Sequence, residues 1–268
     1  MEQLTSEEIR EAVRENYGKV ATAERACGCA PTCCDPNAVA DESAPDANDM
    51  SRALGYSDAE LASVPEGANL GLGCGNPQAI ANLKAGEVVL DLGSGAGFDA
   101  FLAARAVGAT GRVIGVDMTP DMLSKARANA RSAAFTNVEF RLGEIEQLPV
   151  ADNSIDVIIS NCVINLSPEK DRVFNEAYRV LRAGGRLAIS DVVATAELPL
   201  AIREDLSLYS GCVAGASTID SVESMLRNAG FTDIRIQPKD ESKAFIREWA
   251  PGSNIEDYVV SAVIEAVK

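Results

Sequence analysis

The sequence predicts an α/β fold in which helices cover both faces of a seven-stranded, mostly parallel β-sheet. Two observations predict it. From Glu87 onward, short apolar segments rich in Val and Ile alternate with longer segments of helical periodicity, and a glycine-rich turn follows the first such strand. Strands that are apolar on both faces belong to parallel sheets buried between helices, joined by right-handed crossovers. With 268 residues, 47% of them hydrophobic, the chain can bury such a core.

The chain before the first strand is expected to hold helices, a long loop and a glycine-rich turn. A capping-box pattern begins a helix over 5–20, and a second one begins a short helix at Ser57. Between them the helical pattern is lost over 21–49, where four cysteines and three prolines indicate a long loop. The glycine-rich turn surrounds Cys74, and a further helix over 80–83 follows it.

The remaining part of the chain accounts for the seven strands. The five parallel strands are expected at 87–92, 112–117, 138–142, 155–160 and 186–193, with helices at 98–107, 120–133 and 168–181. Gly184 and Gly185 are expected to end the last of these helices. Residues 196–230 are predicted to be mostly helical, and 231–237 and 257–267 to pair as antiparallel strands at the sheet edge.

Charge and composition exclude several classes of function. The 24 Lys and Arg against 40 Asp and Glu give a net charge of −16, which repels nucleic acid and anionic membrane surfaces. The N-terminus lacks the apolar core of a signal peptide, and no apolar run approaches the ~18 residues of a membrane span, so we expect a cytoplasmic protein. The absence of histidine removes the commonest general base and any His-ligated zinc site.

The glycine-rich turn after the first strand indicates a ligand site. It contains Gly93, Ser94, Gly95 and Gly97, and such a turn brings backbone amides close to a ligand. The spacing Gly-x-Gly-x-Gly differs from the Gly-x-Gly-x-x-Gly of a dinucleotide pyrophosphate site. The carboxylate of Asp91, just before the turn, would repel a pyrophosphate and attract an ammonium group.

Two further strand ends complete the predicted ligand. Asp117 ends the second strand, 20 residues after Gly97, which is the usual distance for a carboxylate that accepts ribose hydroxyls. Glu144 and Ile145 follow the third strand, where they could hold an adenine amino group. The ligand therefore has a ribose, an adenine and a cationic amino-acid tail, and it lacks phosphates. Another nucleotide cofactor on the same fold is the alternative.

Together with the runs 148–157 and 179–187, these motifs resemble the S-adenosylmethionine-dependent methyltransferases over roughly residues 85–195. The resemblance implies the Rossmann-like class I methyltransferase fold, with a small helical substrate-binding insertion and S-adenosylmethionine as cofactor. The cofactor-binding residues that we predict are Tyr17, Asp91, Gly93, Ser94, Gly95, Gly97, Asp117, Met118, Glu144, Ile145 and Asn161.

Three cysteines are expected to lie near the methyl group of such a cofactor. Cys162 follows the fourth strand, which adjoins the first strand in this class. Cys74 and Cys212 lie in glycine-flanked turns, which favours exposed and sterically open thiols. Soft thiolates select soft ions, and As(III) takes three thiolates while keeping a lone pair that can attack a methyl group. The alternative for Cys162 is a small buried apolar residue.

The runs 65–77, 160–166 and 209–216, with Tyr17-Gly18 and 55–57, resemble the arsenite methyltransferases of bacteria and archaea. The resemblance implies that Cys162 and Cys212 bind As(III), with Cys74 as third ligand. It also implies that a thiol pair reduces the oxidised arsenic and becomes a disulfide, which a glutathione-type thiol or thioredoxin resets. The N-terminal candidates for pairing with Cys74 are Cys33 and Cys34, and also Cys27 and Cys29.

The resemblance divides the chain into three parts: a helix and cysteine-bearing loop (1–50), a cofactor-binding domain (51–195), and an arsenite-binding cap with edge strands (196–268). Three alternatives stay open. The N-terminal cysteines could form a structural zinc site, although Cys-x-Cys and Cys-Cys spacings suit zinc poorly. The enzyme could be another small-molecule methyltransferase, such as a quinone C-methyltransferase. The chain could also be a non-catalytic metalloid-binding protein.

Overall fold

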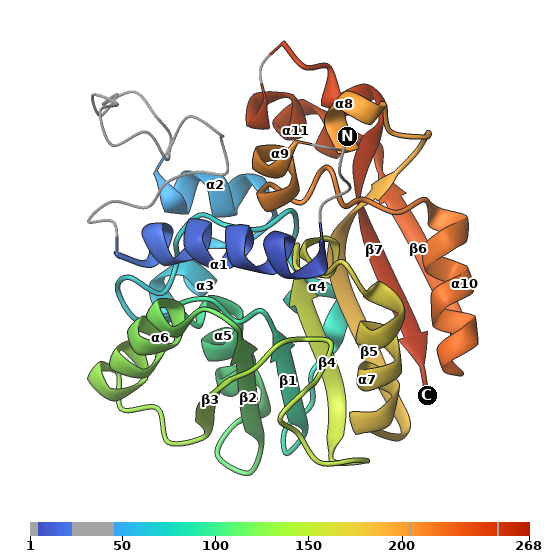
Figure 1. The fold of residues 1–268 in the computed structure, drawn as a ribbon. Coiled ribbons are helices and arrows are strands. Elements are labelled where there is room, and N and C mark those ends of the chain that lie inside the picture. The colour runs from blue at the N-terminus through green and yellow to red at the C-terminus, as the bar shows by residue number, and fades with distance from the viewer. Residues whose placement is uncertain (1–4, 23–45, 204, 251) are drawn as a thin grey trace.

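The computed structural model describes residues 5–22, 46–203, 205–250 and 252–268. They contain one seven-stranded sheet in the order β3-β2-β1-β4-β5-β7-β6, with helices on both faces (Figure 1). The pairs among β1 to β5 are parallel and β7 is antiparallel to β6, as predicted. β7 is also antiparallel to β5, so it joins the parallel strands to β6. The strands are β1 (Val88–Leu92), β2 (Arg112–Asp117), β3 (Val138–Leu142), β4 (Ile155–Asn161), β5 (Leu181–Ala194), β6 (Thr232–Lys239) and β7 (Val259–Val267).

The helices confirm most of the predicted elements and add two. Their bounds are α1 (Ser6–Thr22), α2 (Ala47–Ala53), α3 (Asp58–Ser63), α4 (Gln78–Ala81), α5 (Phe98–Val107), α6 (Pro120–Ser132), α7 (Lys170–Val180), α8 (Leu200–Arg203), α9 (Leu206–Ser210), α10 (Ile219–Ala229) and α11 (Lys243–Trp249). The predicted capping box at Ser57 is present, with Glu60 as its reciprocal partner. The additions are α2, which Asp46 caps at the edge of the expected loop, and α11, in the expected connector between β6 and β7.

The sequence led us to expect that Gly184 and Gly185 end a helix, but this prediction is wrong, because both glycines lie within β5. Helix α7 ends at Val180, and β5 begins at the next residue. Gly184 has φ +78° inside the strand, and the pairing of β5 with β4 shifts register between Ile155 and Val157. The two glycines therefore allow an irregularity in a long strand, and the regular part of β5 begins at Arg186.

The core has two layers because the strand residues alternate between the two faces. Val89 and Ile159 face the side that α5 and α6 cover, whereas Leu90 and Ile158 face the side that α7 and α10 cover. All parallel strands end at one edge of the sheet, and α1 runs across that edge (Figure 1). Within the described part of the chain, no helix has the length and apolar character needed to cross a membrane.

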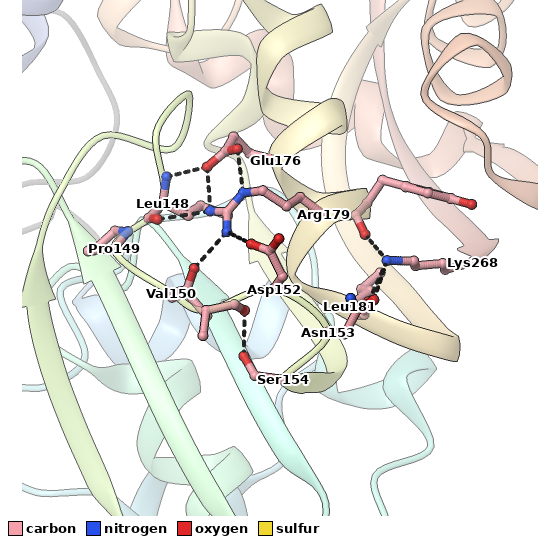
Figure 2. A network of polar contacts seen from close by, with 12 residues as sticks. Leu148, Pro149, Val150, Asp152, Asn153, Ser154, Glu176, Arg179, Leu181 and Lys268 are labelled. Carbon is pink, nitrogen blue, oxygen red and sulfur yellow. Dashed lines mark hydrogen bonds and ion pairs between the residues drawn. The ribbon is translucent and has the colours of Figure 1, made fainter.

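A half-buried arginine fixes the loop that leads into β4. Arg179 on α7 donates to Glu176 through both Nε and Nη2 at 2.7 Å, and to Asp152 at 2.5 Å (Figure 2). It also donates to the carbonyl oxygens of Leu148 at 3.1 Å and Val150 at 2.9 Å. The guanidinium holds the pKa of the Glu176 carboxyl below its usual value. This loop orients β4, whose far end carries Cys162.

We predict that Arg179→Ala lowers the free energy of unfolding by about 2 kcal/mol, because Glu176 loses its charged partner and two carbonyl groups lose their donor. Urea denaturation followed by circular dichroism measures this. The control is Arg227→Ala, which removes an exposed ion pair with Glu223 on α10 and should cost less than about 0.5 kcal/mol. Equal losses in the two variants would contradict the role of Arg179.

Candidate active site

A cavity opens at the edge where the parallel strands end. Its walls come from the turn after β1, the ends of β2 and β4, helix α1 and helix α11. Of the eleven predicted cofactor-binding residues, all except Gly97 and Glu144 line it. The carboxylate of Glu144 instead lies 3.6 Å from the guanidinium groups of Arg10 and Arg14 on α1. A role for Glu144 in binding adenine therefore stays a prediction.

The turn after β1 can only be built with glycine at two positions. Gly93 has φ +65°, and a Cβ there would lie 2.5 Å from the Val163 side chain. Gly97 has φ +98°, and a Cβ there would lie 2.6 Å from the Phe101 ring. Gly97 thus lets α5 start close to the sheet. The Gly95 amide donates to Asp117 Oδ2 at 2.9 Å, which ties the turn to the end of β2.

The buried residues Asp91 and Asp99 and the half-buried Asp117 place three carboxyl groups around this part of the cavity. Burial, with Asp99 and Asp117 nearby, raises the pKa of Asp91 well above its usual value. Burial also raises the pKa of Asp99 to about 6 and the pKa of Asp117 in the same direction. Among the described residues, Asp91 Oδ2 and Ser94 Oγ have no hydrogen-bond partner. A buried carboxylate oxygen without a partner, on a cavity wall, suits a ligand with an ammonium group.

Asp117, at the end of β2, lines the same cavity. Its Oδ1 accepts a hydrogen bond from the Thr119 amide at 2.8 Å, and its Oδ2 accepts from Gly95. Each carboxylate oxygen has a second lone pair, so both can still accept from a ligand. Met118 and Ile145 supply apolar wall beside it. The cavity thus offers the Asp91 carboxylate, which suits an ammonium group, and the Asp117 carboxylate, which can accept from hydroxyl groups. Its apolar wall at Met118 and Ile145 suits a ring.

The three predicted thiols converge beside this cavity from three distant segments. Cys74 precedes α4, Cys162 follows β4, and Cys212 follows α9. The Cys212 thiol donates to the Cys162 carbonyl oxygen at 2.7 Å, and Cys162 has hydrogen-bond contacts with the thiols of both Cys74 and Cys212. The sulfur atoms of Cys74 and Cys162 and a carboxyl oxygen of Asp191 lie within 4.8 Å of one another. Cys162 and Cys212 line the cavity directly.

The expectation that glycine neighbours leave the thiols of Cys74 and Cys212 exposed is wrong. The relative exposures are 1% for Cys74, 8% for Cys162 and 3% for Cys212. They share an apolar cluster with Val13 of α1 and Trp249 of α11, and these helices close over the turns. The neighbouring glycines provide backbone shape instead: a Cβ at Gly73, which has φ +123°, would lie 2.7 Å from the Asn161 amide.

Contacts among the three thiols, and backbone strain at Cys162 and Cys212, distinguish these residues from ordinary core cysteines. Contacts with the Cys212 and Cys74 thiols, together with burial, raise the pKa of Cys162 well above its usual value. Burial raises the pKa of Cys74 as well. Cys162 and Cys212 have left-handed φ values of 59° and 63°. Residues with side chains adopt such angles at a cost of about 1–3 kcal/mol, and such strain is concentrated at functional sites.

A family model for a methyltransferase domain matches residues 83–230. An arsenite methyltransferase from Halobacterium salinarum is 55% identical over 266 residues, which cover 98% of this chain and 67% of that protein. The chain belongs to the arsenite methyltransferase family. An arsenite methyltransferase from Aquipseudomonas alcaligenes is 50% identical over 155 residues, covering 55% of this chain and 45% of that protein. The chain thus spans about two thirds of the Halobacterium relative and less than half of the Aquipseudomonas relative.

A solved structure shares both the fold and the family. It is an arsenic(III) S-adenosylmethionine methyltransferase from Chlamydomonas reinhardtii, with a TM-score of 0.62 and 35% sequence identity. The match covers 84% of this chain and 74% of that one. The Rossmann-like class I methyltransferase fold that the motifs predicted is therefore confirmed.

The predictions for the N-terminal cysteines of the present chain are not tested by the structure. Cys33 and Cys34, and the alternatives Cys27 and Cys29, lie outside the described residues. A disulfide between one of them and Cys74 is therefore not tested, and neither is the alternative of a zinc site.

Two polar residues of the site, Asp191 and Arg10, were not predicted from the sequence. Asp191 is 1% exposed and lies at the thiols, and its signal was a single charge inside the apolar run 186–193. Arg10 forms ion pairs with Glu146 and Glu169 and ties α1 to the cavity rim. Nothing in the pattern of α1 marked Arg10 as buried.

Proposed function

We propose that this chain transfers a methyl group from S-adenosylmethionine to As(III), giving methylated arsenic that the cell can dispose of. The observation that carries the proposal is that one cavity is lined both by Asp91 and by two of three clustered thiols, Cys162 and Cys212. A quinone C-methyltransferase needs the carboxylate for its cofactor but does not need the clustered thiols. Membership in the arsenite methyltransferase family supports the same substrate.

The cofactor end of the cavity has a group for each part of S-adenosylmethionine. We infer that Asp91 binds its ammonium group, Asp117 accepts from its ribose, and Met118 and Ile145 pack against its adenine. The amides of the turn after β1 lie beside the amino-acid part. When bound, S-adenosylmethionine supplies a methyl group on a positively charged sulfur. The carboxylates around it favour that positive charge.

The thiol end of the cavity suits arsenic without a general base. Three protonated thiols exchange with three hydroxide groups of arsenous acid, which leave as water with the thiol protons. The raised pKa values of Cys74 and Cys162 therefore suit this binding step, since the thiol protons are used in it. The product is a neutral arsenic trithiolate, which the apolar cluster around the thiols accommodates. A chain without histidine can perform this chemistry.

The transfer step depends on positioning. The arsenic lone pair forms the new As–C bond while the bond from sulfur to the methyl carbon breaks and its electron pair returns to sulfur. Arsenic is thereby oxidised from As(III) to As(V). We infer that a thiol pair then supplies two electrons and becomes a disulfide. Cys74 with an N-terminal cysteine is the candidate pair, and a glutathione-type thiol or thioredoxin in a cytoplasmic setting would reset it.

We predict that Cys162→Ser abolishes methylation, with a loss of at least about a thousandfold, because the central ligand of the thiol group is removed. The measurement incubates protein with As(III), S-adenosylmethionine and glutathione, and separates the arsenic species by chromatography coupled to mass spectrometry. S-adenosylmethionine affinity serves as the control and should change less than about threefold. Methylated arsenic at the unmodified rate in Cys162→Ser would overturn the proposal.

We also predict that Asp91→Asn weakens S-adenosylmethionine binding at least about tenfold, because a charged acceptor for the ammonium group is lost. Calorimetric titration measures the Kd. As(III) affinity should be unchanged, and Asp220→Asn, on the exposed start of α10, should leave both affinities unchanged. An unaltered cofactor Kd in Asp91→Asn would show that the ammonium group lies elsewhere.

A further inference from the structure

Cys162 lies between two asparagines whose amides reach the backbones of the other two thiol-bearing turns. Asn161 Oδ1 accepts a hydrogen bond from the Cys74 amide at 3.0 Å. Its Nδ2 donates to the carbonyl oxygen of Gly75 at 2.9 Å. One side chain next to Cys162 thus holds the backbone on both sides of the Cys74 sulfur, although 87 residues separate the two positions.

The orientation of Asn161 is itself fixed. Its Nδ2 lies 3.1 Å from the Tyr56 hydroxyl and 3.3 Å from Asp99 Oδ2, and the Tyr56 hydroxyl donates to the same carboxyl group at 2.8 Å. From the opposite side, the Ser261 hydroxyl donates to the Cys74 carbonyl oxygen at 2.7 Å. The Cys74 turn is therefore held from β4 on one side and from β7 on the other.

Asn165 reaches the Cys212 turn through a single, longer contact. Its Nδ2 lies 3.3 Å from the Cys212 carbonyl oxygen, 2.6 Å from that of Val192 and 3.0 Å from Asp191 Oδ1. Asp191 also accepts a hydrogen bond from the Ile164 amide at 2.8 Å. The Asp191 carboxylate therefore binds the backbone next to Asn165, and the Asn165 side chain binds the backbone next to Asp191. All five of these residues are buried, and Asn165 is 3% exposed.

The backbones of Cys162 and Cys212 need support from their surroundings. Cys162 and Cys212 have left-handed backbones that residues with side chains adopt only when their surroundings impose them. A ligand set that is already assembled loses less conformational freedom when it binds its ligand. The contacts of Asn161 and Asn165 reach the backbone of the turns and leave the sulfur atoms free for the ligand.

We propose that Asn161 and Asn165 are positioning residues for arsenic binding. Asn161 acts through Cys74 and Asn165 acts through Cys212, so that the pair sets the spacing of the two outer thiols around Cys162. The proposal rests on the proposed function, since As(III) is the ligand that the thiols are held for. It assigns to Asn161 a task distinct from the cofactor contact that its place on the cavity wall predicts.

A double-mutant cycle on As(III) affinity tests the two pairings. The Kd for As(III) is measured by equilibrium dialysis in the intact chain, with arsenic counted by mass spectrometry. We expect Asn161→Ala to raise the Kd at least about tenfold alone and less than about threefold in a Cys74→Ser background. In a Cys212→Ser background, Asn161→Ala should keep its full effect. Asn165→Ala should show the converse pattern.

Two further variants separate positioning from a general loss of structure. Ser261→Ala removes only the hydroxyl donor to the Cys74 carbonyl, so it should give a smaller rise in Kd that also disappears with Cys74→Ser. Asn137→Ala is the matched control, because this asparagine donates to the carbonyl oxygens of Ala104 and Gly108 far from the thiols. It should lower the unfolding midpoint without changing the Kd.

The outcomes are distinct. Effects of Asn161→Ala and Asn165→Ala that are equal in every background would mean that the asparagines only stabilise the fold, and would overturn the inference. An unmodified protein that does not bind As(III) at all would overturn the proposed function and, with it, this inference. Tight binding by the unmodified protein without the two specific couplings would leave the proposed function standing and remove the inference alone.

Discussion

The parallel pairing of β4 with β1 is the constraint on which the site depends. Leu92 lies opposite Ser160, so the two strands end together, with the turn at Gly93 against Val163. The cofactor-binding turn therefore lies beside Cys162. The Cys162 amide donates to the Ser190 carbonyl oxygen of β5 at 2.7 Å, which brings Asp191 to the same place. A shift of register between these strands would separate the thiols from the cofactor cavity.

The sequence was sufficient for the parts of the site that follow from local pattern. Strand periodicity predicted the sheet, and parallel strands place their carboxyl ends at one edge, so Asp91, Asp117 and Cys162 had to lie near one another. The glycine spacing and the carboxylates indicated the kind of ligand because they are local chemistry. Even the antiparallel strand β7, which lies between β5 and β6, was visible as an apolar run after a long connector.

Burial and long-range hydrogen bonding could not be predicted from the sequence. Whether a thiol flanked by glycines is open depends on what packs over it, and here α1 and α11 come from opposite ends of the described chain. The contact of Asn161 with the Cys74 turn likewise joins segments that no periodicity connects. Asp191 is different: its carboxylate inside an apolar strand was visible in the sequence, so it was missed although a signal was present.

The central claim is that arsenic and the methyl donor meet in one cavity. The most direct test is a crystal structure with As(III) and S-adenosylhomocysteine bound, in which anomalous scattering locates the arsenic. The account predicts arsenic bonded to the Sγ atoms of Cys74, Cys162 and Cys212, with its open side toward the cofactor sulfur, and the cofactor ammonium on Asp91. Arsenic bound away from Cys162, or facing away from the cofactor sulfur, would contradict it.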